Sequence, residues 1–211
     1  MKVLLELEKG KSMYNKYFKR IFDVSLSLMG LPIFFLFFIV FGFLIKLEDK
    51  GPVFYKSKRI GKNTKLYDMY KFRTMKLNAP MILNNDGSTY NGENDSRVTK
   101  IGKLMRETSI DEIPQIINVL KGEMSIIGPR ASLADALGSF KDDEADKMLV
   151  RPGITGYTQA YYRNNLTNRN KRLKDAWYAN NVKIYLDIKI LFKTLTTVLK
   201  REGLYTKVNN K

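Results

Sequence analysis

Residues 24–45 read VSLSLMGLPIFFLFFIVFGFLI, an uncharged apolar run of about 22 residues. As a straight α-helix this run would measure roughly 33 Å, which is long enough to cross the hydrocarbon core of a bilayer. The run is too long for the apolar region of a signal peptide, and no small-residue cleavage site follows it. We therefore predict that residues 24–45 form a permanent membrane helix.

Basic residues flank this run on both sides. They are Lys16, Lys19 and Arg20 before it, and Lys46, Lys50, Lys56, Lys58 and Arg59 after it. Positive flanks are retained on the cytoplasmic side, so a helix that enters the membrane, breaks and returns satisfies both flanks at once. Pro32 is the candidate break, because proline lacks a backbone donor and clashes with the preceding turn. A single-pass helix that tolerates Pro32 is the alternative, and the sequence does not decide between the two.

Composition limits the chemistry that the chain can perform. The 211 residues suit one domain with a membrane element, and 37 Lys and Arg against 21 Asp and Glu give a net charge of +16. Such a charge predicts an anionic partner, namely a lipid surface, a nucleic acid or a phosphorylated substrate. The chain has no Cys and no His, which excludes disulfides, thiolate nucleophiles and imidazole bases. Any metal must bind oxygen ligands, so magnesium, manganese and calcium are favoured.

Local patterns predict a hairpin and a long loop after the membrane run. Residues 51–75 alternate apolar and polar side chains around a Gly-Lys-Asn turn, which is typical of a short β-hairpin. Residues 78–96 are rich in Asn, Gly, Asp and Ser and are predicted to be a loop.

Helical periodicity follows the loop. It begins at Thr99, and a second apolar stripe predicts a helix from Ser109 to Lys121 with Ser109 as its N-cap and Gly122 after its end. A polar helix is predicted to begin near Ser132, and residues 151–155 are predicted to form a turn. Residues 168–200 are predicted to be one long helix, whose apolar and lysine side chains suit either the membrane interface or core packing.

The segment SIDEIPQIINVLKGEMSIIGPR, residues 109–130, contains the sharpest chemical signal. Asp111 and Glu112 are adjacent in the first turn of a predicted helix, where backbone donors and the helix dipole favour anions. The commoner use of such a pair is simply to charge that first turn. Several basic residues favour a phosphate site instead, because they lie in short segments beside Gly, Pro or aromatic residues and guanidinium groups bind phosphate in bidentate geometry. These residues are Lys71, Arg73, Arg106, Arg130 and Arg151.

Three ordered blocks resemble a known family. They are KGPVFYKSKRIGKNTKLYDMYKFRTM at 50–75, RVTKIGKLMRETSIDEIPQIINVLKGEMSIIGPR at 97–130 and VRPGITGYTQ at 150–159. The chain resembles, from about Lys16 to Leu199, the bacterial sugar transferases, which are monotopic polyprenyl-phosphate phosphoglycosyl transferases. The chain resembles the minimal catalytic form of this family, and it is similar to the undecaprenyl phosphate N,N'-diacetylbacillosamine 1-phosphate transferase type. It implies a mostly helical α+β domain, a re-entrant membrane helix and amphipathic helices at the inner face of the cytoplasmic membrane.

The same resemblance implies a reaction. A sugar 1-phosphate would pass from a UDP-sugar to polyprenyl phosphate, giving UMP and a diphosphate-linked sugar through a covalent phosphosugar-aspartate intermediate. Asp111 matches the nucleophile and would also contact Mg²⁺, while Glu112 matches the second acid of the pair. Arg106 is the first choice for phosphate contact, and the other four basic residues match further basic positions of the family. A carboxylate suits the nucleophile role because it is already ionised at neutral pH.

The chain departs from the family pattern in three places. Phe35 and Leu36 stand where a Ser-Pro pair usually breaks the membrane helix, which puts the re-entrant geometry in doubt. Ala131 stands where the family usually has the second proline of Pro-Arg-Pro, and Tyr157 replaces a tryptophan. Neither of the last two changes removes a charge, so we expect altered donor preference rather than another reaction.

Two other classes of protein compete with the enzyme interpretation. A nucleic-acid-binding protein would explain the charge, but no recognisable nucleic-acid motif is present and the apolar run would be unexplained. A catalytically inactive, membrane-anchored basic scaffold protein would explain both the run and its flanks. We expect a tail at 1–15, the membrane helix at 16–50, a cytoplasmic catalytic domain at 51–201 and a tail at 202–211. The sequence identifies no protein partner, and it does not identify the sugar.

Overall fold

The computed structural model of the chain describes residues 13–84 and 89–200. Helices dominate among these residues and two small sheets accompany them, so the predicted mostly helical α+β fold is confirmed. The α-helices and strands are α2 (Lys19–Asp49), β1 (Phe54–Ile60), β2 (Leu66–Phe72), α3 (Lys100–Thr108), α4 (Gln115–Lys121), β3 (Ser125–Ile127), α5 (Asp142–Ala145), β4 (Gly153–Thr155), α6 (Tyr157–Tyr161), α7 (Asn168–Asn180) and α8 (Ile184–Leu199). The shorter or irregular helical turns are η1 (Tyr14–Phe18), η2 (Lys62–Thr64), η3 (Ile110–Glu112), η4 (Ala134–Ser139) and η5 (Asp146–Leu149). The predicted tails lie outside the described residues, apart from residues 13–15.

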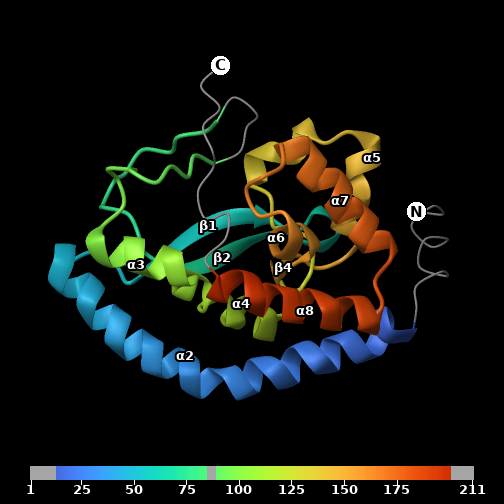
Figure 1. Ribbon diagram of the computed structural model, residues 1–211, viewed down its shortest axis with the longest axis horizontal. Coiled ribbons are helices and arrows are strands. Elements are labelled where there is room, and N and C mark those ends of the chain that lie inside the picture. Colours follow the sequence, from blue (N-terminus) through green and yellow to red (C-terminus); the bar gives the residue numbers. More distant parts are fainter. Residues whose placement is uncertain (1–12, 85–88, 201–211) are drawn as a thin grey trace.

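The longest helix, α2, contains the predicted membrane run. It extends without interruption from Lys19 to Asp49 with Pro32 inside it, and Figure 1 shows it bending near its middle as it passes beneath the other helices. Among the described residues it is the one helix long and apolar enough to cross a membrane, judged by length and composition alone. The helix therefore continues through Pro32, the candidate break of the sequence analysis. A proline removes one backbone donor, and the remaining turns keep their own hydrogen bonds.

Both ends of α2 are bound to the rest of the domain by charged groups. Near its beginning, Lys19 forms a buried ion pair with Asp187 of α8. Arg20 donates to the carbonyl oxygens of Val119 and Leu120 at the end of α4, at 2.6 and 3.1 Å. At its other end, Asp49 forms a bidentate ion pair with Arg73, just after β2. The helix is thus held along the domain rather than projecting from it.

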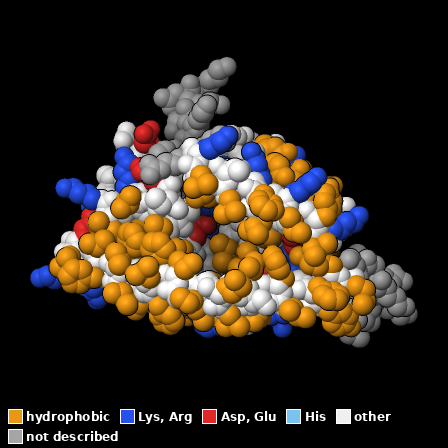
Figure 2. Space-filling view, turned by 60° about the horizontal axis from the view of Figure 1, so that its bottom comes forward, with side chains coloured by type: hydrophobic (Ala, Val, Ile, Leu, Met, Phe, Trp, Pro, Cys, Tyr) orange, Lys and Arg blue, Asp and Glu red, His pale blue; other side chains and the backbone are white. Residues whose placement is uncertain are grey.

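Apolar side chains cover the outer face that α2 shares with α8. Figure 2 shows them gathered along this side of the molecule. On α2 the exposed members include Leu28, Met29, Ile33, Phe35, Leu36, Ile39, Val40, Phe43 and Leu47, and on α8 they are Ile184, Tyr185, Ile188, Phe192, Leu195 and Leu199. This arrangement suits contact with a lipid phase, as predicted for an amphipathic interfacial helix.

The predicted helix at residues 168–200 is in fact two helices. α7 ends at Asn180, and Asn181 and Lys183 adopt non-helical conformations before α8 begins at Ile184. Buried Val182 lies between them and joins the core cluster that includes Tyr178 and Ile190. The apolar periodicity continued across this junction, which is why the sequence predicted one helix.

The hairpin predicted at residues 51–75 is confirmed. β1 and β2 pair antiparallel, with Phe54 opposite Phe72 and Ile60 opposite Leu66. Phe72 packs with Phe41 of α2 and Met105 of α3 in a buried cluster, so the hairpin is stabilised by helices on one of its faces.

The segment predicted to be a turn at residues 151–155 contains strand β4. This strand pairs parallel with β3, with Ser125 opposite Gly153 and Ile127 opposite Thr155. The two chains approach so closely that a Cβ atom on Gly153 would lie 2.1 Å from the backbone nitrogen of Gly128. Glycine is therefore required at position 153 by space rather than by turn geometry.

The middle of the chain also differs from the prediction in its helix boundaries. The predicted helix at 109–121 is divided into η3 and α4, because Pro114 interrupts the hydrogen bonding between them. Ser109 has a φ of 60° and makes no capping hydrogen bond with its side chain, whereas Gly122, with a φ of 82°, ends α4 as predicted. The polar segment after Ser132 forms the short elements η4, α5 and η5 in place of one helix.

Candidate active site

The sharp turn at Ser109 places the two predicted acids at the edge of a cavity. α3 ends at Thr108, Ser109 takes a left-handed conformation, and η3 then carries Asp111 and Glu112. The backbone nitrogen of Glu112 donates to the carbonyl oxygen of Ser109 at 3.2 Å, which closes the turn. Both acidic residues line the cavity, so their position is not that of ordinary surface charges.

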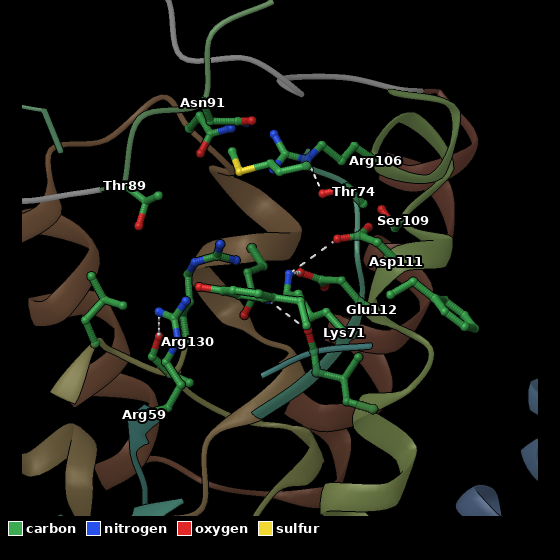
Figure 3. A pocket seen from close by; sticks show the side chains of 18 of the residues that line it. Arg59, Lys71, Thr74, Thr89, Asn91, Arg106, Ser109, Asp111, Glu112 and Arg130 are labelled. Carbon is green, nitrogen blue, oxygen red and sulfur yellow. Dashed lines mark hydrogen bonds and ion pairs between the residues drawn. The ribbon is translucent and has the colours of Figure 1, made fainter. Parts of the chain in front are cut away.

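Lys71 joins the two carboxylates. Its ammonium nitrogen lies 2.5 Å from Oε1 of Glu112 and 3.5 Å from Oδ2 of Asp111. Lys71 comes from β2 and also lines the cavity, so the hairpin supplies the cation and η3 supplies the anions (Figure 3). The ammonium group of Lys71 therefore contacts two carboxylates, and it lies closer to that of Glu112.

The two acids differ in electrostatic environment although they are neighbours. Burial raises the pKa of Asp111 above its usual value; Lys71 opposes the rise, and the charge of Glu112 adds to it. Burial acts on Glu112 in the same direction, but the positive charges of Lys71 and Arg130 outweigh it, so its pKa lies below the usual value. The surroundings therefore favour the charged form of Glu112 more than that of Asp111.

Two predicted arginines lie at the same cavity. Arg106 of α3 donates from Nε to the hydroxyl of Thr74 at 2.9 Å, and Arg130 follows β3 with an exposed side chain. Figure 3 shows Arg106 beside Thr74, above the acidic pair in this view, and Arg130 on the other side of the cavity from the pair. The structure thus brings together Lys71, Arg106 and Arg130 around Asp111 and Glu112.

The other two predicted phosphate ligands have different surroundings. Arg73 borders the cavity, but its guanidinium is engaged by Asp49 and by the carbonyl oxygens of Pro52 and Met75, at 2.6 and 3.2 Å. Arg151 is not among the residues that line the cavity, and its Nε donates to the carbonyl oxygen of Gly122 at 2.8 Å. The contacts of both arginines indicate that they stabilise the fold.

The sequence did not single out several polar residues that the fold brings to the cavity. These are Arg59, Thr74, Thr89, Asn91 and Ser109. Thr89 and Asn91 come from the loop after β2, which sequence composition identified only as a loop. Arg59 lies on β1, where strand alternation distinguishes it from its exposed basic neighbours Lys56 and Lys58.

The cavity is large and reaches from the acidic pair to the apolar face. Its volume is about 1600 Å³. Its lining includes Gly30 and Ile33 of α2 and Thr194, Thr197 and Val198 of α8, the two helices that carry the exposed apolar side chains. The space could therefore accept a polar group near the acidic pair together with an apolar group between the two helices.

The donor set near the acidic pair can accommodate a magnesium ion only with help from a ligand. Within residues 13–84 and 89–200 no group of three or more His, Cys, Asp or Glu side chains is placed to hold a metal. Asp111 and Glu112 nevertheless provide adjacent carboxylate oxygens. Magnesium commonly takes one or two carboxylates together with water and substrate phosphates, so the residues fit this mode of binding.

Comparisons with known proteins agree with the geometry. The sequence model of the family described as "Bacterial sugar transferase" matches residues 14–201. The chain is 37% identical over 202 residues to an undecaprenyl-phosphate galactose phosphotransferase of Salmonella typhimurium, covering 90% of this chain and 42% of that protein. It is 36% identical over 193 residues to a UDP-N-acetylgalactosamine-undecaprenyl-phosphate N-acetylgalactosaminephosphotransferase of Aeromonas hydrophila, covering 89% and 45%. An uncharacterized sugar transferase, EpsL, of Bacillus subtilis is 38% identical over 192 residues, covering 88% and 89%. The chain thus spans less than half of the first two of these relatives and most of the third.

Proposed function

The chain belongs to the bacterial sugar transferase family, and we propose that it transfers a sugar 1-phosphate from a UDP-sugar to a polyprenyl phosphate such as undecaprenyl phosphate. The products would be UMP and a polyprenyl-diphosphate-sugar, the first membrane-bound product of a bacterial glycoconjugate pathway. The observation that supports this most is the cluster of Asp111, Glu112 and Lys71 at a cavity that also reaches the apolar face. We infer the polyprenyl phosphate acceptor and the UDP-sugar donor from the names of the relatives in Salmonella and Aeromonas.

Asp111 is proposed as the nucleophile. One of its carboxylate oxygens would attack the β-phosphorus of the UDP-sugar, and the bond from that phosphorus to the bridging oxygen would break, releasing UMP. A phosphate oxygen of the polyprenyl phosphate would then attack the same phosphorus and free the carboxylate. The buried position of Asp111 at the cavity supports this role, because covalent catalysis requires a nucleophile within reach of the substrate.

The surrounding charges would offset the repulsion between an anionic donor and the acidic pair. Lys71 and Glu112 hold each other at 2.5 Å, and this contact positions the ammonium group next to the Asp111 carboxylate. Arg106 and Arg130 would bind phosphate oxygens by charge-assisted hydrogen bonds. A magnesium ion held by Asp111, with Glu112 nearby, would supply further positive charge to the diphosphate.

The membrane helix would deliver the lipid acceptor to this site. We propose that α2 enters and leaves the cytoplasmic membrane on its inner face, because Lys19 and Asp49, near its two ends, both contact the same domain. The isoprenoid chain would lie between α2 and α8, and its phosphate would point towards Asp111. Single cysteines near Lys11 and at Lys50 should both react with an impermeant thiol reagent only after the inner face is exposed. Labelling of either one from the periplasmic side would contradict this topology.

A donor panel tests the reaction itself. Detergent-solubilised protein should release UMP when it is mixed with magnesium, polyprenyl phosphate and one UDP-sugar of a set that includes UDP-galactose, UDP-N-acetylgalactosamine and other acetamido UDP-sugars. Release of UDP in place of UMP would indicate glycosyl transfer and would overturn the mechanism. If an Asp111→Asn variant restored a glycan-deficient strain as well as the wild type does, the alternative of an inactive membrane-anchored basic scaffold would replace the enzyme.

A further inference from the structure

Arg59 is the half-buried basic residue of strand β1. Its neighbours Lys56 and Lys58 are exposed, and Lys58 forms only a surface ion pair with Asp68 at 3.3 Å. Side chains alternate between the two faces of a strand, so Arg59 and Ser57 share the inward face. Nε of Arg59 donates to the Ser57 hydroxyl at 2.9 Å.

Arg59 makes no direct contact with a carboxylate in the part of the chain that the structure describes. Among residues 13–84 and 89–200, none of the ion pairs involves Arg59. Besides the contact of Nε with Ser57, its guanidinium donates a long hydrogen bond of 3.4 Å to the carbonyl oxygen of Ala131. Burial and the like charge of Arg130 lower the pKa of Arg59, and they outweigh the opposing charge of Glu112. Holding a half-buried guanidinium beside a second one costs free energy unless an anion binds there.

The segment that carries Arg130 is fixed by buried groups. The backbone nitrogen of Arg130 donates to Asp175 at 3.0 Å, and Lys147 donates to the carbonyl oxygen of Arg130 at 2.9 Å. The strand β1 is tied to the same segment, because the nitrogen of Ile60 donates to the carbonyl oxygen of Ser132 at 3.0 Å. The backbones of Arg59 and Arg130 therefore keep a fixed relation to each other.

Both guanidinium groups belong to the cavity of the acidic pair. Arg59 and Arg130 line it, and Figure 3 shows them together on the side of the view away from Asp111. Their positive charges act on Glu112, whose pKa both of them lower. A phosphate placed between the acidic pair and these arginines would be contacted from the side opposite Lys71.

We propose that Arg59 and Arg130 together form a phosphate-binding pair in the cavity, with Arg59 as a substrate-binding residue in its own right. This inference rests on the proposed function, since it assigns the pair to a phosphate of that reaction. The chemistry recognised is a phosphate ester, which either the nucleotide or the lipid acceptor can supply. In the first case the pair would bind the phosphate that leaves as UMP, and in the second case it would bind the polyprenyl phosphate.

Binding of UMP, uridine and a short-chain polyprenyl phosphate to the full chain in detergent tests the pair. Arg59→Gln is expected to weaken the binding of one phosphate ester by about ten- to hundredfold, because a hydrogen bond to a charged group is lost. Binding of uridine, which lacks phosphate, should not change. Arg59→Lys should have an intermediate effect because it keeps the charge without the guanidinium fork, and it replaces Arg59→Gln as the test if that variant does not fold. Lys58→Gln, one position away and exposed, should leave all three affinities unchanged.

The outcomes show whether the nucleotide or the lipid acceptor supplies the bound phosphate. They also test the role of Arg59 separately from the proposed function. Weaker binding of UMP assigns the pair to the nucleotide, and weaker binding of only the polyprenyl phosphate assigns it to the acceptor. Unchanged affinities for both phosphate esters in the Arg59 variants would overturn the role of Arg59 while leaving the proposed function intact. A wild-type protein that binds neither phosphate ester better than uridine would overturn the proposed function as well.

Discussion

The carboxylate of Asp111 and that of Asp187 are both buried beside a lysine, yet their surroundings are opposite. Asp187 accepts hydrogen bonds from the hydroxyls of Tyr14 and Tyr178, at 2.7 and 2.6 Å, in addition to its ion pair with Lys19. Asp111 shares the single cation Lys71 with a second carboxylate and faces a cavity.

The difference separates two uses of a buried charge. A carboxylate whose oxygens are all bound within the protein stabilises the fold and has no capacity left for a ligand. A carboxylate that shares one lysine with a second carboxylate lowers the stability of the fold, but its oxygens can still bind a ligand. This arrangement is typical of functional sites. The comparison therefore predicts opposite consequences for substitutions at positions 111 and 187.

The largest effect is expected from Asp111→Ala. Loss of the nucleophile should reduce UMP release by at least about a thousandfold, as removal of a covalent nucleophile does in other enzymes. Thermal unfolding in the same detergent should show no loss of stability, because Lys71 keeps Glu112 at 2.5 Å. Substantial activity in this variant would remove Asp111 from the nucleophile role, and a large loss of stability would remove the distinction between the two carboxylates.

Asp187→Asn should have the reverse pattern. It leaves the buried ammonium group of Lys19 without its counter-charge, so the free energy of unfolding should fall by about 3–5 kcal/mol. Asp68→Asn, which breaks a surface ion pair with Lys58, is the matched control and should change stability little. The folded fraction of Asp187→Asn should keep UMP release within a few-fold at low temperature. A variant that melts like the wild type but is inactive would show that Asp187 is functional.

This contrast also shows what the sequence could and could not predict. The apolar run, the hairpin and the acidic pair have local signals, namely composition, alternation and adjacency, and all three lie where the sequence predicted. Strands β3 and β4 have only three residues each and pair across a long connection, so no local pattern revealed them. The sequence identified basic residues near motifs, but it did not show which of them the fold brings together at the cavity.

Arg73 and Arg59 illustrate that last difference. Both lie in or beside the hairpin among other basic residues, and the sequence favoured Arg73. In the structure Asp49, at the end of α2, engages Arg73, while Arg59 has no ion pair among the described residues and faces the cavity. The partner of a charged side chain is set by tertiary packing, which the spacing of motifs does not encode. The match of Arg73 to a motif therefore could not show that the fold engages it in an ion pair and leaves Arg59 without one among the described residues.

The smallest expected effect is a pH-dependent change in stability, and it has opposite signs at positions 111 and 112. The pKa of Asp111 is raised by folding, so the stability associated with its protonated form is present at low pH and is lost as the pH rises through the folded-state pKa. Asp111→Asn should therefore match the wild type in acid and become more stable than it as the pH increases.

The pKa of Glu112 is lowered by folding, so its contribution is present above the unfolded-state pKa and is lost as the pH falls through the folded-state pKa. Glu112→Gln should thus be less stable than the wild type near neutral pH, and the difference should shrink in acid. Melting temperatures of the two variants and the wild type, measured from about pH 4 to about pH 8, give both signs in one series. Parallel curves for the two variants would mean that the neighbouring acids share one environment, and the electrostatic distinction between Asp111 and Glu112 would be lost.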